Sequence, residues 1–472
     1  MSAISAPSGA GRLSTPVIFA FASAAIPAAA LGLVLGVYMP RFFASHLHIG
    51  LLAVGGAVAT VRLIDVFFDI IIGWGMDRTR TRFGRYRVWY VIGMPILMLA
   101  VYELFNPPAG VGVGYLMTWL LVMYAGISIS TLAHQAWAAN IATDYHERSR
   151  VIGWMQAVGI FGAVSLLLLP LLSHGLIDPS KGSSMSILGW IIMAAIPITT
   201  LLVVVATPER IKPEAKKETF ALKDYIRTIT RPTMVRLILA DLFLTLGPGT
   251  TGPLYIFFFH DAKGFEPSVV SLLLIPFIGA GVLGAPFWAR VAKRFSKHRT
   301  LQIAAVCYAV AQTTLMAIPA GLLVPTAFGM FAVGFCSSAF LLLVRSMVAD
   351  YADEMKLEQG AERTGMLYAM VILTQKIGSS ITVSIVFPIL AFVGYNAMEG
   401  AVNTERAITG LEMCYLFAPV ILVLVGAAMV FGYKLDDKRH AEIREALDKR
   451  DFELAEANAE PLSGTVAPTQ RG

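Results

Sequence analysis

Long apolar runs separated by short polar connections cover most of the chain and predict helices that cross a membrane. A helix of about 20 apolar residues spans a hydrocarbon core of about 30 Å and satisfies its own backbone groups. The runs predict about twelve such spans, near residues 16–39, 51–76, 88–106, 112–141, 151–173, 185–206, 233–259, 267–290, 300–319, 322–349, 365–394 and 410–434. The pattern therefore predicts an all-α polytopic membrane protein.

Composition supports this fold class. Hydrophobic residues make up 56% of the 472 residues and charged residues only 14%, a balance that does not suit a soluble protein. The net charge of +6 is no sign of a nucleic-acid partner, because basic residues of membrane proteins gather in cytoplasmic loops. The three cysteines lie inside apolar runs without metal-site spacing and are interpreted as packing residues.

The distribution of Lys and Arg predicts the orientation. Connections after even-numbered spans are rich in both, as in DRTRTRFGRYR at 77–87, whereas the opposite connections carry few. Both termini are therefore expected in the cytoplasm, with the protein in the plasma membrane, which is the inner membrane in a bacterium. Residues 435–456 alternate charged and apolar side chains at helical spacing and predict a surface helix, read as a solvated tail without a transport role.

The longest polar stretch between spans falls near the middle of the chain. This divides the sequence into a first half at 1–206, a cytoplasmic loop at 207–232, a second half at 233–434 and a tail at 435–472. The halves also resemble each other, since spans two and eight both end in basic loops and spans four and ten both run into acidic ones. Such an internal repeat is typical of transporters.

Three ionisable residues interrupt the second apolar run. Arg62, Asp65 and Asp69 are spaced by three and four residues and so share one face of a helix. Two carboxylates at membrane depth repel each other and are costly, so they need a cation, a proton or a basic partner. Alternatively, Arg62 permanently neutralises one aspartate while the other is a buried, protonated acid.

Three further charges lie inside spans of the second half. Lys376 in span eleven is costly alone and either joins the central charges or reaches toward an interface. Arg345 in span ten either binds a carboxylate, sulfonate or phosphate of a substrate, or forms a gate ion pair with Asp350 or Asp353. Asp241 in span seven is a proton site, a substrate site or a structural partner of these bases.

Span four combines polar and aromatic groups. Trp137 follows His134 by three residues, so both share a face, and an indole ring can stack on a sugar; packing is the alternative. Gln135 lies beside them and corresponds to Arg345 in the internal repeat. His134 either titrates near neutral pH or makes an ordinary interhelical hydrogen bond.

Charged loops at the cytoplasmic ends of the spans predict gating contacts. Asp77 and Arg78 follow span two, and Asp77 can pair with Arg148 or Arg150 after span four. The second half offers Asp350, Asp353 and Arg363 in equivalent places. Breaking such contacts is expected to shift the balance between inward and outward states without abolishing binding.

The segment DIIIGWGMDRTRTRFGRYRVW at 69–89 resembles the span-two signature of the glycoside–pentoside–hexuronide:cation symporters, the melibiose permease group of the major facilitator superfamily. DYHERSR at 144–150 and the segment 349–378 resemble further motifs of that family, so the resemblance covers nearly the whole chain. It implies a major facilitator fold with alternating access, and a coupling cation, Na⁺ or H⁺, on Asp65 and Asp69. Ser128 or Thr131 would add an oxygen, and Lys376 would join the charged network.

This chain also departs from the family pattern. Ile70 stands where proline is usual, His134-Gln135 replaces a proline–aromatic pair, and span one has no ionisable residue, which argues against galactoside specificity. Arg62, His134, Gln135, Trp137, Asp241, Arg345 and Lys376 are the candidate substrate residues. The prediction is a monomeric symporter, not an enzyme, that imports a sugar, glycoside or hexuronide-like sugar acid and needs no cofactor. The alternatives are a carrier of lipids or other amphiphiles, and a non-transporting sensor.

Overall fold

The computed structural model describes residues 13–79, 81–141, 145–172, 182–209, 227–359, 364–398, 400–433, 435 and 437–459. Within these residues, twelve helical segments are long and apolar enough to cross a membrane, as the hydropathy pattern predicts. The described ranges contain helices, π-helical turns and loops but no strand. The all-α prediction is therefore confirmed for this part of the chain.

The helices fall into two consecutive sets. The first set comprises α1 (Thr15–Ala22), α2 (Ala25–Leu33), η1 (Val34–Tyr38), α3 (Met39–Arg41), η2 (Phe42–His46), α4 (Leu51–Arg78), α5 (Tyr86–Phe105), α6 (Val113–Ile141), α7 (Tyr145–Leu172) and α8 (Gly182–Ala206). The second comprises α10 (Pro232–Phe257), η3 (Phe258–Ala262), α11 (Pro267–Leu272), α12 (Leu274–Phe295), α13 (Lys297–Ala317), α14 (Leu323–Gln359), α15 (Thr364–Phe392) and α16 (Glu405–Met429). The helix α17 (Asp437–Ala459) follows.

Two helices are longer than their apolar runs predict. The first span continues through π-helical turns η1 and η2 to His46, instead of ending near residue 39. Helix α14 continues to Gln359, past the expected end at 349. Its last residues are charged but still form helices well, so the helix projects beyond the apolar zone and the hydropathy pattern misses this part.

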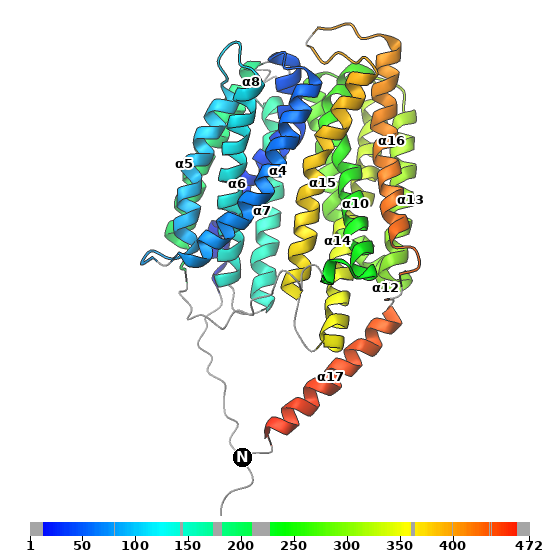
Figure 1. Cartoon of the computed structure of the whole chain (residues 1–472). Helices are drawn as coiled ribbons and strands as arrows, with labels where there is room; N and C mark the ends of the chain where they lie inside the picture. Colours follow the sequence, from blue (N-terminus) through cyan, green and yellow to red (C-terminus); the bar gives the residue numbers. More distant parts are fainter. Residues whose placement is uncertain are drawn as a thin grey trace, which may run out of the picture.

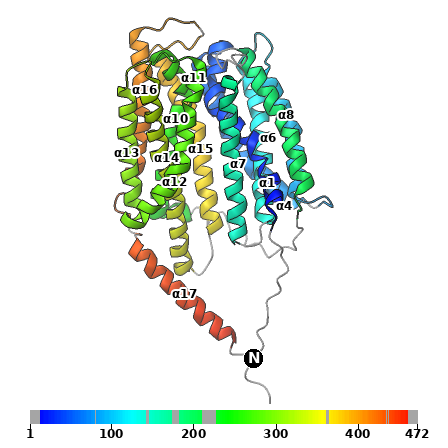
Figure 2. The same cartoon turned by 180° about the vertical axis from the view of Figure 1, so that it is seen from behind.

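The two sets of helices form two bundles that lie side by side (Figures 1 and 2). In the first bundle α5 packs against α6 and α8; in the second, α12 and α13 pack against α14, and α10 packs against α16. Helix α4 runs along α15 and η1 touches α10, which joins the bundles. This arrangement places the charges of α4 directly opposite the second half.

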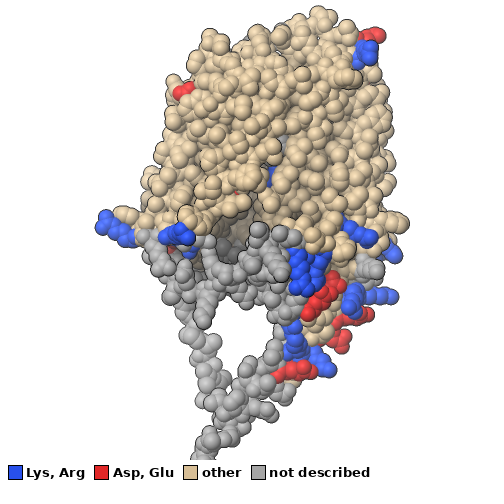
Figure 3. Space-filling model, in the orientation of Figure 1, with Lys and Arg blue, Asp and Glu red and all other residues tan. Residues whose placement is uncertain are grey.

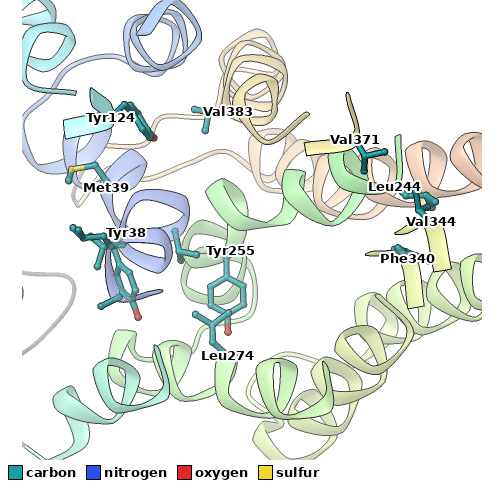
Figure 4. Packing of buried hydrophobic residues seen from close by; sticks show 14 of the residues in the cluster. Tyr38, Met39, Tyr124, Leu244, Tyr255, Leu274, Phe340, Val344, Val371 and Val383 are labelled. Atoms are coloured by element: carbon teal, nitrogen blue, oxygen red, sulfur yellow. The ribbon is translucent and has the colours of Figure 1, made fainter. Parts of the chain in front are cut away.

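The bundles touch at the end far from α17. Tyr38 Oη donates a hydrogen bond to Ser271 Oγ at 3.0 Å, and Ser384 Oγ donates to the carbonyl of Gly55 at 3.2 Å. Figure 4 shows Tyr38 and Tyr255 on neighbouring helices of the two halves. In Figure 3 the surface is hollowed toward the opposite end, where charged side chains gather near α17. The structure is closed at one end and more open at the other.

Glu209, just after α8, caps the first turn of α5. Its carboxylate accepts hydrogen bonds from the backbone N–H groups of Arg85, Tyr86 and Arg87 at 2.7, 2.8 and 3.0 Å. A carboxylate at a helix N-terminus satisfies unpaired donors and interacts favourably with the helix dipole. Gly84 approaches this carboxylate with a φ of 112°, where an added Cβ would lie 2.0 Å from Glu209 Oε2. This contact fixes the loop between α4 and α5.

We expect Glu209→Ala to destabilise the protein by about 1–2 kcal/mol, because three helix donors lose a charged acceptor. The thermal unfolding midpoint of the purified protein in detergent measures the loss. Glu209→Gln keeps an acceptor oxygen and should lose less. Wild-type midpoints for both variants would contradict the capping role.

Candidate functional site

Three charged side chains from the two halves meet in the bundle interior. Asp65 and Asp69 lie one turn apart on α4, and Lys376 reaches them from α15. Lys376 Nζ lies 2.8 Å from Asp65 Oδ2 and also bonds Asp69 Oδ2. Asp65 is buried, whereas Asp69 and Lys376 are partly exposed. A single lysine therefore bridges two carboxylates that would otherwise repel each other.

Ser128 and Arg62 complete this group. Ser128 Oγ, on α6, donates to Asp65 Oδ1 at 2.9 Å and accepts from Lys376 Nζ at 3.1 Å. Arg62 Nη1 lies 3.8 Å from Asp65 Oδ2, and its guanidinium stacks 4.0 Å from the ring centroid of Tyr124. We call Arg62, Asp65, Asp69, Ser128 and Lys376 the charged cluster.

The charged cluster balances its own charge. Two carboxylates face one ammonium and one guanidinium, an arrangement that offsets the cost of holding ions away from water. Asp69 Oδ1 is buried and has no hydrogen-bond partner among the described residues. The oxygens needed to hold a small hard cation are thus present, but Lys376 occupies the space between them.

A central cavity of about 450 Å³ lies between the halves beside this cluster. Its polar and aromatic lining from both halves includes Arg62, Tyr124, Thr251, Gln312, Ser379 and Tyr415, and most of the rest is apolar. Pro248 and Gly249 also line it, yet α10 runs through them without a break. The glycine–proline–glycine run at 247–249 is therefore part of a continuous helix in this structure.

The polar residues of span four face a different cavity. Thr131, His134 and Gln135 line a space of about 320 Å³ inside the first half, which we call the first-half cavity. The buried His134 has its Nε2 at 3.0 Å from the carbonyl of Phe21, an interhelical hydrogen bond of the ordinary kind. Ser128 thus joins the charged cluster, while Thr131 lies apart from it.

Trp137 packs inside the first half. It is fully buried beside Phe21 and Tyr90, and its Nε1 donates to the carbonyl of Pro208 at 3.3 Å. Arg87 stacks on its ring at 5.4 Å. Because the indole is fully buried and is not part of the central-cavity lining, its position fits the packing alternative.

Asp241 lines a third space, of about 460 Å³, which we call the second-half cavity. Gln375 Nε2 donates to Asp241 Oδ1 at 3.2 Å. The half-buried Arg345 acts on Asp241 electrostatically but is absent from the lining of the three cavities described above. Arg345 therefore lies outside the lining of the central cavity.

The candidate gating residues that can be described contact their own half or the C-terminal tail. Arg78 stacks 3.8 Å from the ring of Trp74, and Arg150 bonds the carbonyl of Leu13. Asp350 pairs with Lys297 at 2.7 Å, and Asp353 pairs with His440 and Arg444 of α17, each at 3.1 Å. The side chains of Asp77 and Arg148, and all of Arg363, lie outside the described residues.

Asp350 and Asp353, the acids proposed as gate partners of Arg345, thus form ion pairs with other residues. The sequence predicted a helix near α17 but gave no signal for its contacts with Asp353, because His440 and Arg444 lie in a tail that alternates charges without a membrane constraint. Tyr124 and Gln375 were also missed as candidates. Tyr124 precedes Ser128 by four residues and so shares its helix face, a signal that could have placed it beside the charged cluster.

Comparison with known proteins identifies the family of this chain. The sequence pattern of the family described as MFS/sugar transport protein matches residues 20–437, nearly all the spans. The chain belongs to this family. The resemblance drawn from the span-two motif is thereby confirmed, and the protein is a multi-pass member of a family of transporters, which is not a class of enzymes.

Individual relatives are distant but cover most of the transporter. The isoprimeverose transporter of Lactiplantibacillus pentosus is 25% identical over 419 residues, covering 84% of both chains. The sodium-dependent lysophosphatidylcholine symporter 1-B of Danio rerio is 22% identical and covers 82% of this chain and 81% of its own. The structure of the nucleoside transporter NupG has a TM-score of 0.65 at 13% identity, covering 89% of this chain and 100% of its own. This likeness confirms the major facilitator fold.

Proposed function

We propose that this transporter is a secondary symporter that moves a sugar or glycoside together with Na⁺ or H⁺. The observation that carries the proposal is Lys376 of the second half bridging Asp65 and Asp69 of the first half, beside the central cavity. Because these ion pairs join the two halves, their distances depend on how the halves are placed relative to each other. Any cation that enters it must change the contact that joins them.

The proposed coupling is a competition for the two aspartates. When Lys376 holds both carboxylates, Lys376 and Arg62 together offset their negative charge, and the halves are linked through α4 and α15. A Na⁺ or a proton on Asp69 would replace the ammonium, with Ser128 Oγ as a neutral oxygen beside it for Na⁺. Lys376 would then be released, and α4 and α15 could separate as access changes from one side to the other.

The substrate would enter the central cavity. A space of about 450 Å³ falls within the usual range for small-molecule sites. From the first half, Arg62 contributes guanidinium hydrogen-bond donors to the cavity and Tyr124 contributes an aromatic ring. The face of an aromatic ring can stack on the apolar side of a sugar ring. The name of the Lactiplantibacillus relative supports a glycoside as the cargo.

The proposal also includes the orientation of the protein in the membrane and the two rigid bodies that move during transport. The end that bears α17 and the arginine-rich loop after α4 would be cytoplasmic, by the positive-inside rule. The structure would then be an inward-open state with its outer end closed. The rigid bodies would be residues 1–206 and 233–434, joined by the loop at 207–232.

An amphipathic cargo is the second candidate. Most of the central cavity lining is apolar, and one relative is named a lysophosphatidylcholine symporter. A sensor that binds without transport is the third. Measuring which solute the protein exchanges across a membrane distinguishes the sugar symporter, the amphiphile carrier and the sensor.

Counterflow in proteoliposomes tests the proposal. Vesicles loaded with isoprimeverose should take up the labelled sugar, and a Na⁺ or proton gradient should drive accumulation above the external concentration. Liposomes without protein give the background. Exchange of lysophosphatidylcholine alone would establish the amphiphile carrier instead, and binding of sugar without exchange would establish a sensor.

A further inference from the structure

Asp241 is a buried carboxylate with one unused oxygen. It lies on α10 and is 2% exposed. Its Oδ1 accepts from Gln375, whereas its Oδ2 is buried and has no hydrogen-bond partner within the described residues. A buried acceptor that lacks a donor is costly, so a native protein normally supplies one. A ligand with a hydrogen-bond donor could therefore supply the partner that Asp241 Oδ2 lacks among the described residues.

The second-half cavity in front of Asp241 has room for such a donor. Its polar lining is Asp241, Thr245, Ser337, Gln375, Lys376 and Ser379. Leu244 and Phe340, which Figure 4 shows close to each other, belong to its apolar wall. Pro248 and Ser379 line both this cavity and the central cavity, so the two spaces adjoin.

The first half lacks an equivalent acid. The second-half cavity is lined from spans seven, ten and eleven, and the first-half cavity takes its lining from the matching spans one, four and five, with spans three and six. The described lining of the first-half cavity includes His134, Gln135 and Gln156 but no carboxylate. The two related halves thus present different chemistry at matching places.

We propose that the second-half cavity is a subsite for the hydroxyl groups of a neutral glycoside, with Asp241 Oδ2 as the acceptor. The inference rests on the proposed function and narrows its substrate class. Adjacent sugar hydroxyls can donate to the two oxygens of a carboxylate, while Gln375 and the hydroxyls of Ser337 and Ser379 can donate or accept. A sugar acid would place a second anion against Asp241 and be rejected.

This subsite also lies next to the coupling residues. Gln375 precedes Lys376 on α15, so a ligand bound to Gln375 acts on the helix that carries the bridge to Asp65 and Asp69. The positive charge of Arg345 also acts electrostatically on Asp241. With Asp241 in the subsite, the hexuronide-like substrates inferred from Arg345 are disfavoured, because a sugar acid would bring a second anion to this carboxylate.

Equilibrium binding to the purified full chain tests the subsite. The probes are isoprimeverose, methyl β-D-glucoside and its acidic counterpart methyl β-D-glucuronide, each followed by calorimetry. Wild-type protein should bind the neutral probes and bind the glucuronide at least about tenfold more weakly. Asp241→Asn should bind the neutral probes about 10- to 100-fold more weakly, the loss expected for a hydrogen bond to a charged group, and the gap to the glucuronide should shrink.

Two further variants show whether a loss of binding in Asp241→Asn comes from the subsite or from misfolding of the protein. Asp448→Asn changes an exposed aspartate of α17 and should bind like wild type. Ser337→Ala removes one hydroxyl from the cavity lining and should weaken neutral-probe binding a few-fold even if Asp241→Asn does not fold.

The outcomes separate the subsite from the function. Wild-type affinity for the neutral probes in both Asp241→Asn and Ser337→Ala would overturn the subsite and leave the sugar symporter standing. Unchanged affinity with an altered pH dependence of uptake in Asp241→Asn would also overturn it and make Asp241 a proton site. If wild-type protein binds none of the sugars, the proposed function itself fails.

Discussion

Asp69→Asn should abolish accumulation of sugar against a gradient while leaving exchange down a gradient. The amide removes one of the two negative charges that attract a cation, and it also removes the ion pair with Lys376. Substrate can still bind and the halves can still move, but transport is no longer tied to the ion. Uphill uptake and counterflow, measured in the same proteoliposomes, give the two readouts.

Asp69→Glu is the matched control because it keeps the charge and lengthens the side chain by one methylene. We expect it to retain part of the coupled accumulation. Normal accumulation in Asp69→Asn would refute the assignment of the coupling site to this aspartate. Loss of both accumulation and counterflow, in protein that unfolds at the wild-type temperature, would place Asp69 in substrate binding.

Lys376→Met should destabilise the protein by about 3–5 kcal/mol, the usual cost of removing one partner from a buried ion pair. Asp65 and Asp69 would then face each other with only Arg62 to offset them, at 3.8 Å from Asp65. Thermal unfolding in detergent measures the loss, and Na⁺ or low pH should restore part of it by neutralising the carboxylates. Lys293→Met, at an exposed position, is the control.

The double variant Lys376→Met with Asp69→Asn tests whether the two residues act as a pair. Removing both partners restores the charge balance with Arg62 and Asp65, so the double variant should be more stable than Lys376→Met alone. If the two losses simply add, the bridge between α15 and α4 does not contribute to stability, and the competition between Lys376 and the cation loses its basis.

The candidate site was predictable where its residues share one helix. Arg62, Asp65 and Asp69 are neighbours because a helix brings residues three and four apart onto one face. Lys376 lies 307 residues from Asp69, so no local rule pairs them, and the resemblance to a family supplied that link. Trp137 and Arg345 could be placed on their helices but not turned toward a cavity, since rotation about the helix axis depends on the neighbouring helices.

The sequence by itself determined the twelve spans, the charge asymmetry of the loops and the acid–base spacing in α4. These follow from the cost of exposing polar groups to lipid and from the fixed period of a helix, which act within a single segment. Only the tertiary structure decided that Lys376 bridges both aspartates and that Asp353 pairs with α17. It also decided that Asp241 lines a cavity and has a buried oxygen without a hydrogen-bond partner among the described residues. These contacts join segments far apart in the chain, and the packing of helices sets them.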